Sequence, residues 1–230
     1  MAGEFPPRTE TVERLRAAGS VFAEDEAALL GDREDLIERR CNGERLEHVL
    51  GWVDFAGVRL AIEPGVFVPR PQTAALALAA AARRPRIALD LFAGCGAIAA
   101  VVASRNPAAR VVACELHVTD CLRQNVAEVH ESDVDGGVPA ELEGQVDVLT
   151  ANVPYVPTAE LQYVPHDGEP AAALDGGPDG LRWFRAVIDV APRWLTPTGA
   201  VFVECGQHQV DAVRALAPPG LELVVVTRDA

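Results

Sequence analysis

The sequence lacks the features that would place it in a membrane or on a secretory route. No apolar run among its 230 residues approaches the roughly 20 residues that a helix needs to span a bilayer. Residues 1–8 show no basic start followed by an apolar stretch, which is how a secretory signal would begin. We therefore expect no membrane segment and a cytoplasmic location.

Paired cysteines and metal-binding patterns are also missing. The five cysteines are an odd number, are scattered, and include no Cys-x-x-Cys pair. The five histidines show no spacing that would put two ligands on one helix face. We interpret the cysteines as reduced cytosolic thiols and predict no metal site. The cysteines are Cys41, Cys95, Cys114, Cys121 and Cys205.

Positive charge is scarce. The chain holds 34 acidic residues against 20 lysines and arginines, which gives a net charge of -14 at pH 7. A field of this sign repels the phosphate backbone of a duplex unless a local basic patch overcomes it. Arg83, Arg84 and Arg86 form the one dense basic cluster, and a solvated helix end explains them best. We therefore do not expect a nucleic acid as the partner.

The length suits one full hydrophobic core with a small extra module. Short helical patterns, broken by Gly31 and Gly43, predict a helical module over residues 1–51. Alternating apolar residues then predict a β-hairpin connector over residues 52–71. Residues 72–230 remain for the main domain.

Strand and helix signals alternate throughout the main domain. Apolar strands that alternate with helices are typical of a doubly wound α/β fold, in which helices cover both faces of a mostly parallel sheet. The predicted strands cover residues 87–92, 111–116, 146–151, 200–204 and 221–227. The predicted helices cover residues 73–82, 97–104, 119–129, 180–195 and 207–216.

A glycine loop follows the first predicted strand and leads into a helix. It covers residues 90–96, Asp-Leu-Phe-Ala-Gly-Cys-Gly, and its two glycines would let backbone N–H groups approach an anionic or carboxylate-bearing ligand. The full dinucleotide fingerprint of three glycines is absent, so the glycines could also serve only to close a tight turn. The candidate ligand-binding residues of the loop are Asp90, Phe92, Ala93, Gly94 and Gly96.

Acidic residues stand at the ends of the next strands. Glu115 ends the second predicted strand, where a carboxylate can accept hydrogen bonds from both ribose hydroxyls of a nucleoside. An acidic residue at a strand end can also simply cap the following helix. Asp133 could mark the end of a third strand and accept a hydrogen bond from an adenine amino group. With the glycine loop, these residues indicate a nucleoside-containing cofactor.

The most specific feature is the motif Asn152-Val153-Pro154-Tyr155. It follows the strand predicted over residues 146–151, and doubly wound sheets place their ligands at the carboxyl ends of strands. A strand followed by an ordinary proline turn would also explain it. Here, however, the motif occurs with a nucleoside-type loop and a ribose carboxylate in the right order. We therefore take its four residues as candidate catalytic residues.

Together these features resemble the HemK/PrmC family of glutamine-amide methyltransferases, which modify the Gly-Gly-Gln motif of peptide-chain release factors. The similarity covers nearly the whole chain. It implies a class I methyltransferase sheet, S-adenosyl-L-methionine as the cofactor, a release factor as the partner and a helical module that recognises this substrate. The matching segments are residues 45–51, 55–57, 64–71, 90–96 and 152–155.

The resemblance also implies roles within the motif. In the family, the Asn side-chain oxygen and the carbonyl of the next residue accept hydrogen bonds from the acceptor NH₂, and the Tyr packs against the planar amide. Here these would be Asn152, the Val153 carbonyl and Tyr155, with Pro154 between them, and Asn152 would also border the cofactor. Such a scheme needs no side-chain base, so catalysis would rest on positioning and electrostatics.

Val153 replaces the first proline of the family motif, which keeps the carbonyl but frees φ from the value of about −65° that proline imposes. This difference and the short helical module leave alternatives open. The same N-methylation could act on a small metabolite or a peptide natural product. Related motifs serve amino groups of DNA or RNA bases, although the negative charge opposes this. The chain could also be a non-catalytic binding module, but Asn152 and Tyr155 are both retained.

Overall fold

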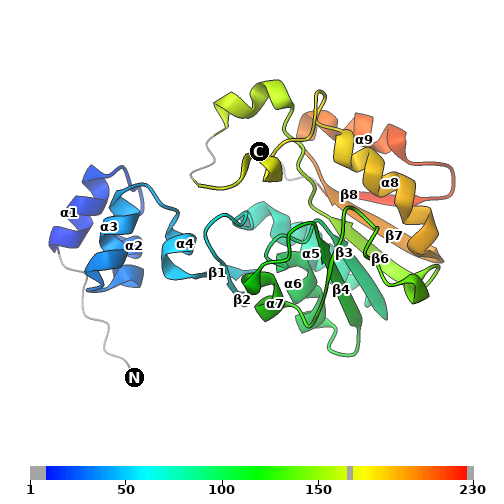
Figure 1. The fold of residues 1–230 in the computed structure, drawn as a ribbon, viewed down its shortest axis with the longest axis horizontal. Helices are drawn as coiled ribbons and strands as arrows, with labels where there is room; N and C mark the ends of the chain where they lie inside the picture. The colour runs from blue at the N-terminus through cyan, green and yellow to red at the C-terminus, as the bar shows by residue number, and fades with distance from the viewer. Residues whose placement is uncertain (1–8, 165–167, 227–230) are drawn as a thin grey trace. The chain divides into compact units, whose positions relative to one another are not determined.

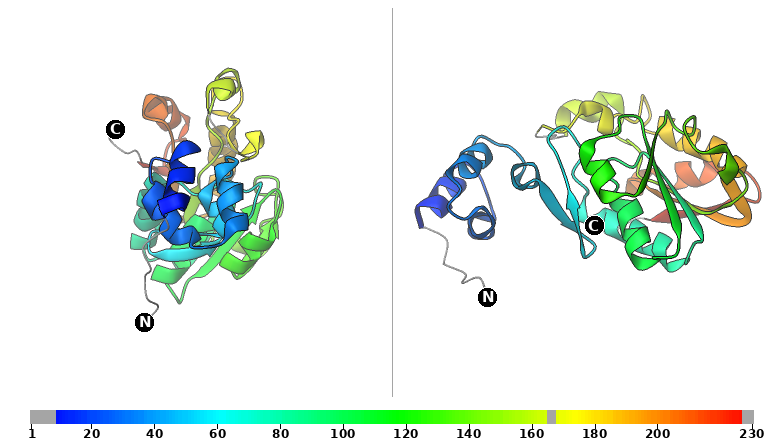
Figure 2. Two further views of the ribbon diagram at one scale, coloured as in Figure 1. Left: turned by 90° about the vertical axis from the view of Figure 1, so that its left-hand side faces the viewer. Right: turned by 60° about the horizontal axis from the view of Figure 1, so that its bottom comes forward.

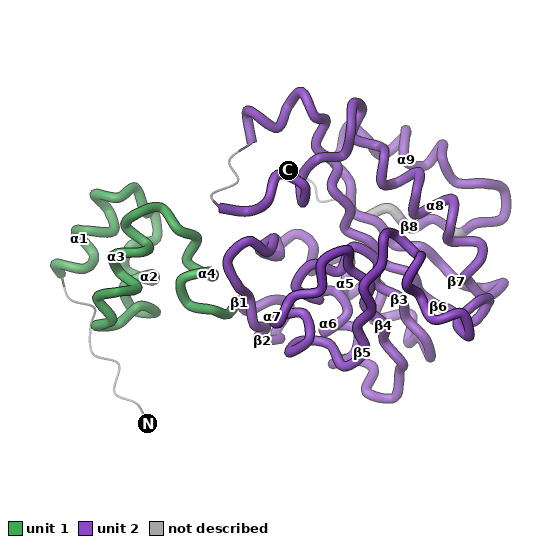
Figure 3. Tube along the Cα trace, viewed as in Figure 1, with its two compact units in different colours: residues 1–52 green, residues 53–230 purple. Residues whose placement is uncertain are grey.

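A computed structural model describes residues 9–164 and 168–226 of the chain. Two compact units follow one another in the sequence, the first ending at Trp52 and the second beginning at Val53 (Figure 3). Within the described ranges, no helix has the length and apolar character needed to cross a membrane.

The first unit is helical. Its core is formed by apolar residues from each helix, among them Leu15, Leu30 and Ile37, which are at most 2% exposed. Glu26 is also buried, and Arg40 donates to both of its carboxylate oxygens at 2.9 and 3.0 Å. A bidentate pair of this kind offsets the cost of burying the charge. The helices are α1 (Thr9–Ala17), α2 (Ala23–Leu30), α3 (Glu34–Cys41) and α4 (Leu46–Leu50).

A β-hairpin, formed by β1 (Trp52–Phe55) and β2 (Val58–Ala61), stands at the start of the second unit. Ala56 and Gly57 make its turn with φ of 50° and 83°, and two successive positive φ values suit a two-residue hairpin. Asn125, the last residue of α7 (Asp120–Asn125), donates to the carbonyls of Ala61 and Cys95 and accepts from the Ala61 N–H, each at 2.8 Å. One side chain therefore joins the hairpin, α7 and the glycine loop.

The second unit is built on a sheet of six strands that is parallel throughout the described residues. The strands lie in the order β5-β4-β3-β6-β7-β8. The chain moves outward in one direction from β3 and in the other from β6, so the order reverses between these two strands. This confirms the predicted doubly wound fold. The strands are β3 (Ile87–Leu91), β4 (Arg110–Glu115), β5 (Glu128–Glu131), β6 (Val146–Ala151), β7 (Leu195–Glu204) and β8 (Glu222–Val226).

Helices cover both faces of this sheet (Figures 1 and 2). Apolar residues of α5 (Ala74–Ala82), α6 (Ala97–Arg105) and α7 share one core with every second residue of the strands and with the hairpin. The intervening strand residues form a second core with α8 (Arg182–Trp194) and α9 (Val210–Leu216). Burial on both sides explains why the central strands are continuously apolar. Short 3-10 helices are η1 (Pro71–Thr73), η2 (Ala140–Leu142), η3 (Thr158–Tyr163), η4 (Ala171–Ala173) and η5 (Gln207–Gln209).

Two predicted elements differ from the structure. The helix predicted over residues 119–129 is wrong in its second half, because α7 ends at Asn125 and Val129 pairs with Ala113 inside β5. Pairing with a neighbouring strand, which no local pattern reveals, decides this stretch. The strand predicted from residue 200 begins five residues earlier, at Leu195, with an irregular register against β6. The predicted strand end at residue 227 lies outside the described residues.

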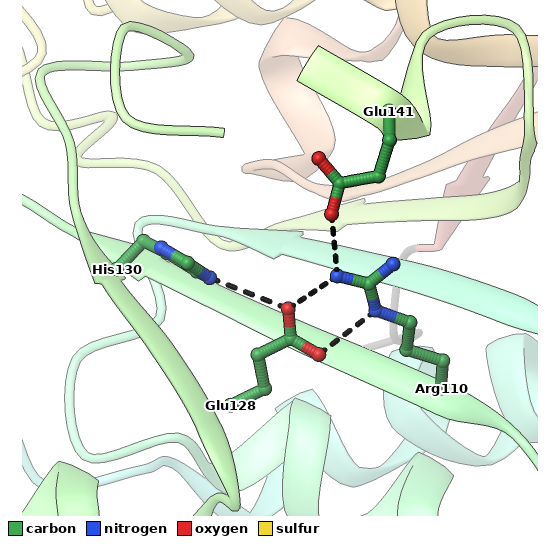
Figure 4. A network of polar contacts seen from close by, with 4 residues as sticks. All are labelled: Arg110, Glu128, His130 and Glu141. Atoms are coloured by element: carbon green, nitrogen blue, oxygen red, sulfur yellow. Dashed lines mark hydrogen bonds and ion pairs between the residues drawn. The ribbon is translucent and has the colours of Figure 1, made fainter. Parts of the chain in front are cut away.

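An ion-pair network ties β4 to β5 at their amino ends (Figure 4). Arg110 donates to both carboxylate oxygens of Glu128, at 2.9 and 2.7 Å, and its Nη2 also contacts Glu141 at 3.0 Å. His130 Nε2 lies 3.3 Å from the same Glu128 carboxylate. The Arg110 guanidinium lowers the pKa of Glu128 below its ordinary value, against the opposing effect of burial.

This network gives a pH-dependent contribution to stability. Because the folded pKa of Glu128 is lowered, its contribution is present above the unfolded pKa and is lost as the pH falls through the folded value. We expect Arg110→Met, which keeps the side-chain stem, to lower the free energy of unfolding by about 1 kcal/mol at pH 7. The loss should be smaller in urea titrations near pH 3, below the ordinary pKa of a glutamate. A difference of equal size at both pH values would contradict the electrostatic origin.

Candidate active site

The candidate residues lie at the carboxyl edge of the sheet, around the point where the strand order reverses. The glycine loop follows β3, Glu115 ends β4 and Asn152 follows β6. The structure therefore brings the loop, the strand-end acid and the Asn-Val-Pro-Tyr motif to one edge, as the sequence predicts. This is the edge at which doubly wound folds bind ligands.

Asp90 holds the glycine loop to its surroundings. Its side chain is 2% exposed and uses both oxygens, since Oδ1 accepts from the Thr150 hydroxyl at 2.6 Å and Oδ2 from the Ala99 N–H at 3.2 Å. Burial raises the pKa of Asp90 to about 7, although these two hydrogen bonds oppose the shift. Asp90 thus caps the first turn of α6 and joins it to β6. The role of Thr150 was not predicted, because its only signal in the sequence is a hydroxyl within an apolar strand.

Phe92 gives the loop its unusual backbone. Its φ is 56°, a left-handed value that is uncommon for a residue with a bulky side chain. The Phe92 ring meets Trp183 of α8 edge-on, with centroids 5.4 Å apart, and Trp183 Nε1 donates to the Asp175 carbonyl at 2.9 Å. These contacts hold Phe92 in a conformation that costs on the order of 1–3 kcal/mol in isolation. This role of Trp183 was not predicted from the sequence.

The two loop glycines serve different purposes. At Gly94, with φ of 57°, an added Cβ would meet nothing within 4 Å. At Gly96, with φ of 81°, it would lie 2.5 Å from Val126 Cγ2 and 2.8 Å from Leu122 Cδ1. Gly96 is therefore required for the packing of the loop against α7, while Gly94 leaves open space beside the backbone. The space at Gly94 suits the close approach of a ligand.

Glu115 lies directly beside the loop. Its Oε2 accepts from the Gly94 N–H and its Oε1 from the Leu116 N–H, both at 2.8 Å. An ionised carboxylate has about four acceptor positions, so both oxygens keep the capacity to bind further donors. Asp133 is exposed in the turn after β5, and the Ser132 N–H ties this turn to the Glu115 carbonyl at 2.9 Å. The nucleoside-binding roles of Glu115 and Asp133 remain predictions.

We expect Glu115→Ala to weaken binding of S-adenosyl-L-methionine by about tenfold or more, because a buried ribose hydroxyl pair would lose its acceptor. The N–H groups of Gly94 and Leu116 would lose theirs as well. Titration calorimetry measures the effect. Asp189→Ala, which removes an exposed carboxylate on α8, is the matched control and should leave the affinity unchanged. Unchanged affinity in Glu115→Ala would remove this residue from the site.

The Asn-Val-Pro-Tyr motif is braced by a glycine-containing segment that follows it. Val153 is 2% exposed, and the Tyr155 carbonyl accepts from Gln209 Nε2 at 3.0 Å. A Cβ on Gly176 would lie 2.8 Å from the Tyr155 Cα, and one on Gly180 would lie 2.5 Å from the Tyr155 carbonyl oxygen. Only glycine allows these approaches. The backbone of the motif is therefore fixed by Gly176, Gly180 and Gln209, none of which was predicted as a site residue.

The connector segment is held to the same region by a buried ion pair. Glu169 is 3% exposed, and its carboxylate accepts from Arg70 Nη2 at 2.6 Å and from the Val68 N–H at 2.8 Å. The Arg70 guanidinium also lies 4.5 Å from the centre of the Phe67 ring. The matching segment 64–71 is thus tied to the chain that follows the motif. Glu169 was missed because nothing in the sequence links it to a segment about 100 residues away.

The thiols near this edge are poor nucleophiles. Burial raises the pKa of Cys95 and of Cys114 to about 12 and that of Cys205 to about 11, so these thiols are protonated at neutral pH. The described residues contain no group of three or more His, Cys, Asp or Glu side chains that could hold a metal ion.

The chain is similar to known methyltransferases, although no protein-family model matches it. It is 37% identical to the release factor glutamine methyltransferase of Geobacter sulfurreducens over 77% of this chain and 66% of that protein. It is 37% identical to the protein of the same name from Streptomyces coelicolor over 90% and 81%. The 4-amino-L-phenylalanine/4-methylamino-L-phenylalanine methyltransferase of Streptomyces pristinaespiralis is 36% identical over 78% and 67%. The chain thus spans just under two thirds of the Geobacter sulfurreducens protein.

Proposed function

The chain belongs to the family of release factor glutamine methyltransferases, and from this we propose that it transfers a methyl group from S-adenosyl-L-methionine to a glutamine side-chain amide of a peptide-chain release factor. The observation that carries the proposal is the position of Asn152, at the end of β6 and on the same sheet edge as the glycine loop and Glu115. We further propose that the helical module, residues 1–51, recognises the release factor.

The residues at this edge fit such a cofactor. The Glu115 carboxylate can accept from the two ribose hydroxyls, and the open space at Gly94 leaves room for the cofactor beside the loop backbone. We assign to Asp133 the adenine amino group. When bound, S-adenosyl-L-methionine supplies an electrophilic methyl group on its sulfonium. We expect this activity in the cytoplasm, where five free cysteines remain reduced.

The acceptor is an amide nitrogen, which is a weak nucleophile because its lone pair is delocalised into the carbonyl. The Asn152 Oδ1 and the Val153 carbonyl would each accept one N–H of the acceptor, so the nitrogen is oriented toward the methyl group and developing positive charge is stabilised. Tyr155, which is half-buried, would pack against the planar amide. Pro154 has no backbone N–H, so it adds no donor that would compete with the NH₂ group of the methyl acceptor for these two oxygens.

The test is methyl transfer to a purified full-length release factor, with mass spectrometry to locate the methyl group. We expect one methylated glutamine, within the Gly-Gly-Gln motif. A release factor in which this glutamine is replaced by glutamate is the matched control and should take up no methyl group. Absence of methyl transfer to any release factor, from protein that binds the cofactor, would overturn the proposal.

The Streptomyces pristinaespiralis relative supports a second candidate, because its name assigns it an aromatic amine as the methyl acceptor. Val153 stands where the family motif has proline, so the pocket around the acceptor differs from the family pattern at this position. Incubation with 4-amino-L-phenylalanine in parallel with the release factor decides between the two. Faster methylation of the amine would favour the second candidate.

A further inference from the structure

Thr73 immediately precedes helix α5, where threonine usually caps a helix by accepting a hydrogen bond from a backbone N–H. The Thr73 side chain makes no such bond, although the residue is only 2% exposed. Thr119, at the same position before α7, does cap its helix and accepts from the Leu122 N–H at 3.3 Å. The Thr73 hydroxyl is therefore used differently.

The partners of Thr73 are Asn152 and Glu204. Asn152 Nδ2 donates to Thr73 Oγ1 at 3.4 Å. The Thr73 side chain also lies close enough to the Glu204 carboxylate for its hydroxyl to lower the pKa of that carboxylate by hydrogen bonding. Glu204 is 7% exposed, and its Oε2 has no hydrogen-bond partner in the described part of the chain. Burial raises the pKa of Glu204, and the bond from Thr73 opposes this shift. Losing the hydrogen bond from Thr73 would therefore cost this buried carboxylate a large amount of free energy.

The register of the sheet brings these groups together. Ala151 of β6 pairs with Val203 of β7. The next residue of each chain segment is therefore Asn152, just after β6, and Glu204, the last residue of β7, and these two lie side by side. Strand residues alternate between faces, and Glu204 shares its face with Phe202, which packs in the same core as helix α5. The helix that begins after Thr73 covers this face. The contact therefore follows from the architecture of the fold.

We propose that Glu204 is a positioning residue that acts through Thr73 to hold the Asn152 carboxamide in one of its two orientations. When Glu204 is ionised it can only accept hydrogen bonds, so the Thr73 hydroxyl donates its hydrogen bond to Glu204 and can only accept from Asn152. Asn152 then presents Nδ2 to Thr73 and keeps Oδ1 for the NH₂ group of the methyl acceptor. The inference rests on the proposed function, in which Oδ1 accepts from that group. We call this arrangement the Glu204–Thr73–Asn152 relay.

The opposite orientation is disfavoured by the same bonds. With Oδ1 turned toward Thr73, the hydroxyl would donate to Asn152 and leave Glu204 without a donor. A second unpaired buried acceptor disfavours this orientation by about tenfold to a hundredfold. Without the relay both orientations are populated, and the wrong one turns a donor toward the acceptor NH₂. The turnover number then falls because fewer molecules are competent.

The relay is tested with variants that change hydrogen bonding and preserve shape. Thr73→Val and Glu204→Gln should each lower kcat about tenfold, since valine has no hydroxyl and glutamine can donate to Thr73. Thr73→Ser keeps the hydroxyl and should restore kcat to near the wild-type value. The KM for the cofactor should remain unchanged. Thr119→Val is the matched control, and it should lower the Tm by about 2–4 °C with kcat unchanged.

The double variant tells a relay from two separate structural roles. If Glu204 acts only through Thr73, the variant with both Thr73→Val and Glu204→Gln should lose no more activity than the worse single variant. Losses that multiply would overturn the relay. So would a Thr73→Ser variant as inactive as Thr73→Val.

A readout without an acceptor separates the relay from the proposed function. In isotope-labelled protein, the NH₂ signals of Asn152 can be identified by their loss in Asn152→Asp. We expect their exchange with water to speed up about fivefold or more in Thr73→Val and Glu204→Gln, and not in Thr119→Val. Unchanged exchange in both relay variants would overturn the relay. Faster exchange in a protein that methylates no release factor would support the relay and reject the proposed function.

Discussion

Replacing Asn152 with alanine is expected to lower the turnover number for methyl transfer about 10²–10³-fold, because one preorganised contact to the reacting nitrogen is lost. The affinity for S-adenosyl-L-methionine should stay within about twofold, since we assign the side-chain oxygen mainly to the acceptor. Single-turnover methylation of a release factor measures the first quantity, and titration calorimetry measures the second. A parallel loss of cofactor affinity would mean that Asn152 mainly binds the cofactor.

Asn152→Asp sharpens this experiment. Aspartate keeps an acceptor oxygen but adds a charge that is costly to desolvate beside a neutral amide. It also cannot donate to Thr73, so the bond between them is changed as well. We expect Asn152→Asp to impair methylation of a glutamine amide strongly and that of an amine such as 4-amino-L-phenylalanine less. Equal losses on both acceptors would contradict this account of the site.

Gly96→Ala is expected to lower the free energy of unfolding by about 2–4 kcal/mol, the combined cost of a positive φ and of overpacking. The added methyl group would lie 2.5 Å from Val126, whose branched side chain has little freedom to move. Gly94→Ala also carries a positive φ but meets no neighbour within 4 Å, so it should cost about 1 kcal/mol. Urea denaturation of the two variants measures the difference.

The same pair separates packing from binding. The methyl group of Gly94→Ala would enter the open space beside the loop backbone, so this variant should fold well yet bind S-adenosyl-L-methionine more weakly. Under conditions in which Gly96→Ala remains folded, its stability should fall more than its affinity for S-adenosyl-L-methionine. Gly94→Ala with wild-type affinity would show that the cofactor does not approach the loop at this position.

The parts of the site that could be predicted are those whose positions follow from the fold alone. Glu115 and Asn152 stand at the ends of strands, and a parallel sheet collects the carboxyl ends of its strands at one edge. Once the apolar runs predict the strands, the prediction that these two residues lie at one edge of the sheet needs no further information. The helix predicted over 119–129 was wrong only in the part that pairs with β4, because strand pairing depends on a distant segment and not on the local pattern.

The residues that were missed depend on contacts between distant segments. Thr73 precedes a helix, where threonine commonly caps, but its side chain makes no cap bond and instead accepts a hydrogen bond from Asn152, 79 residues further along the chain. Glu169 and Trp183 support the site from segments whose approach no short motif records. Charge and aromatic patterns identify such residues only after the chain has been traced in three dimensions.

The reversal of strand order also has a consequence for how the protein folds. Strands β3, β4 and β5 are close in sequence, but Ala88 of β3 must also pair with Val148 of β6, across two intervening strands and their helices. Contacts over such separations carry a large loop-closure cost and slow the search for the native state. During synthesis, the half that carries the glycine loop and Glu115 leaves the ribosome before β6 does. Asn152 is placed opposite this half only when the two halves dock, so catalytic competence should appear in the last folding phase.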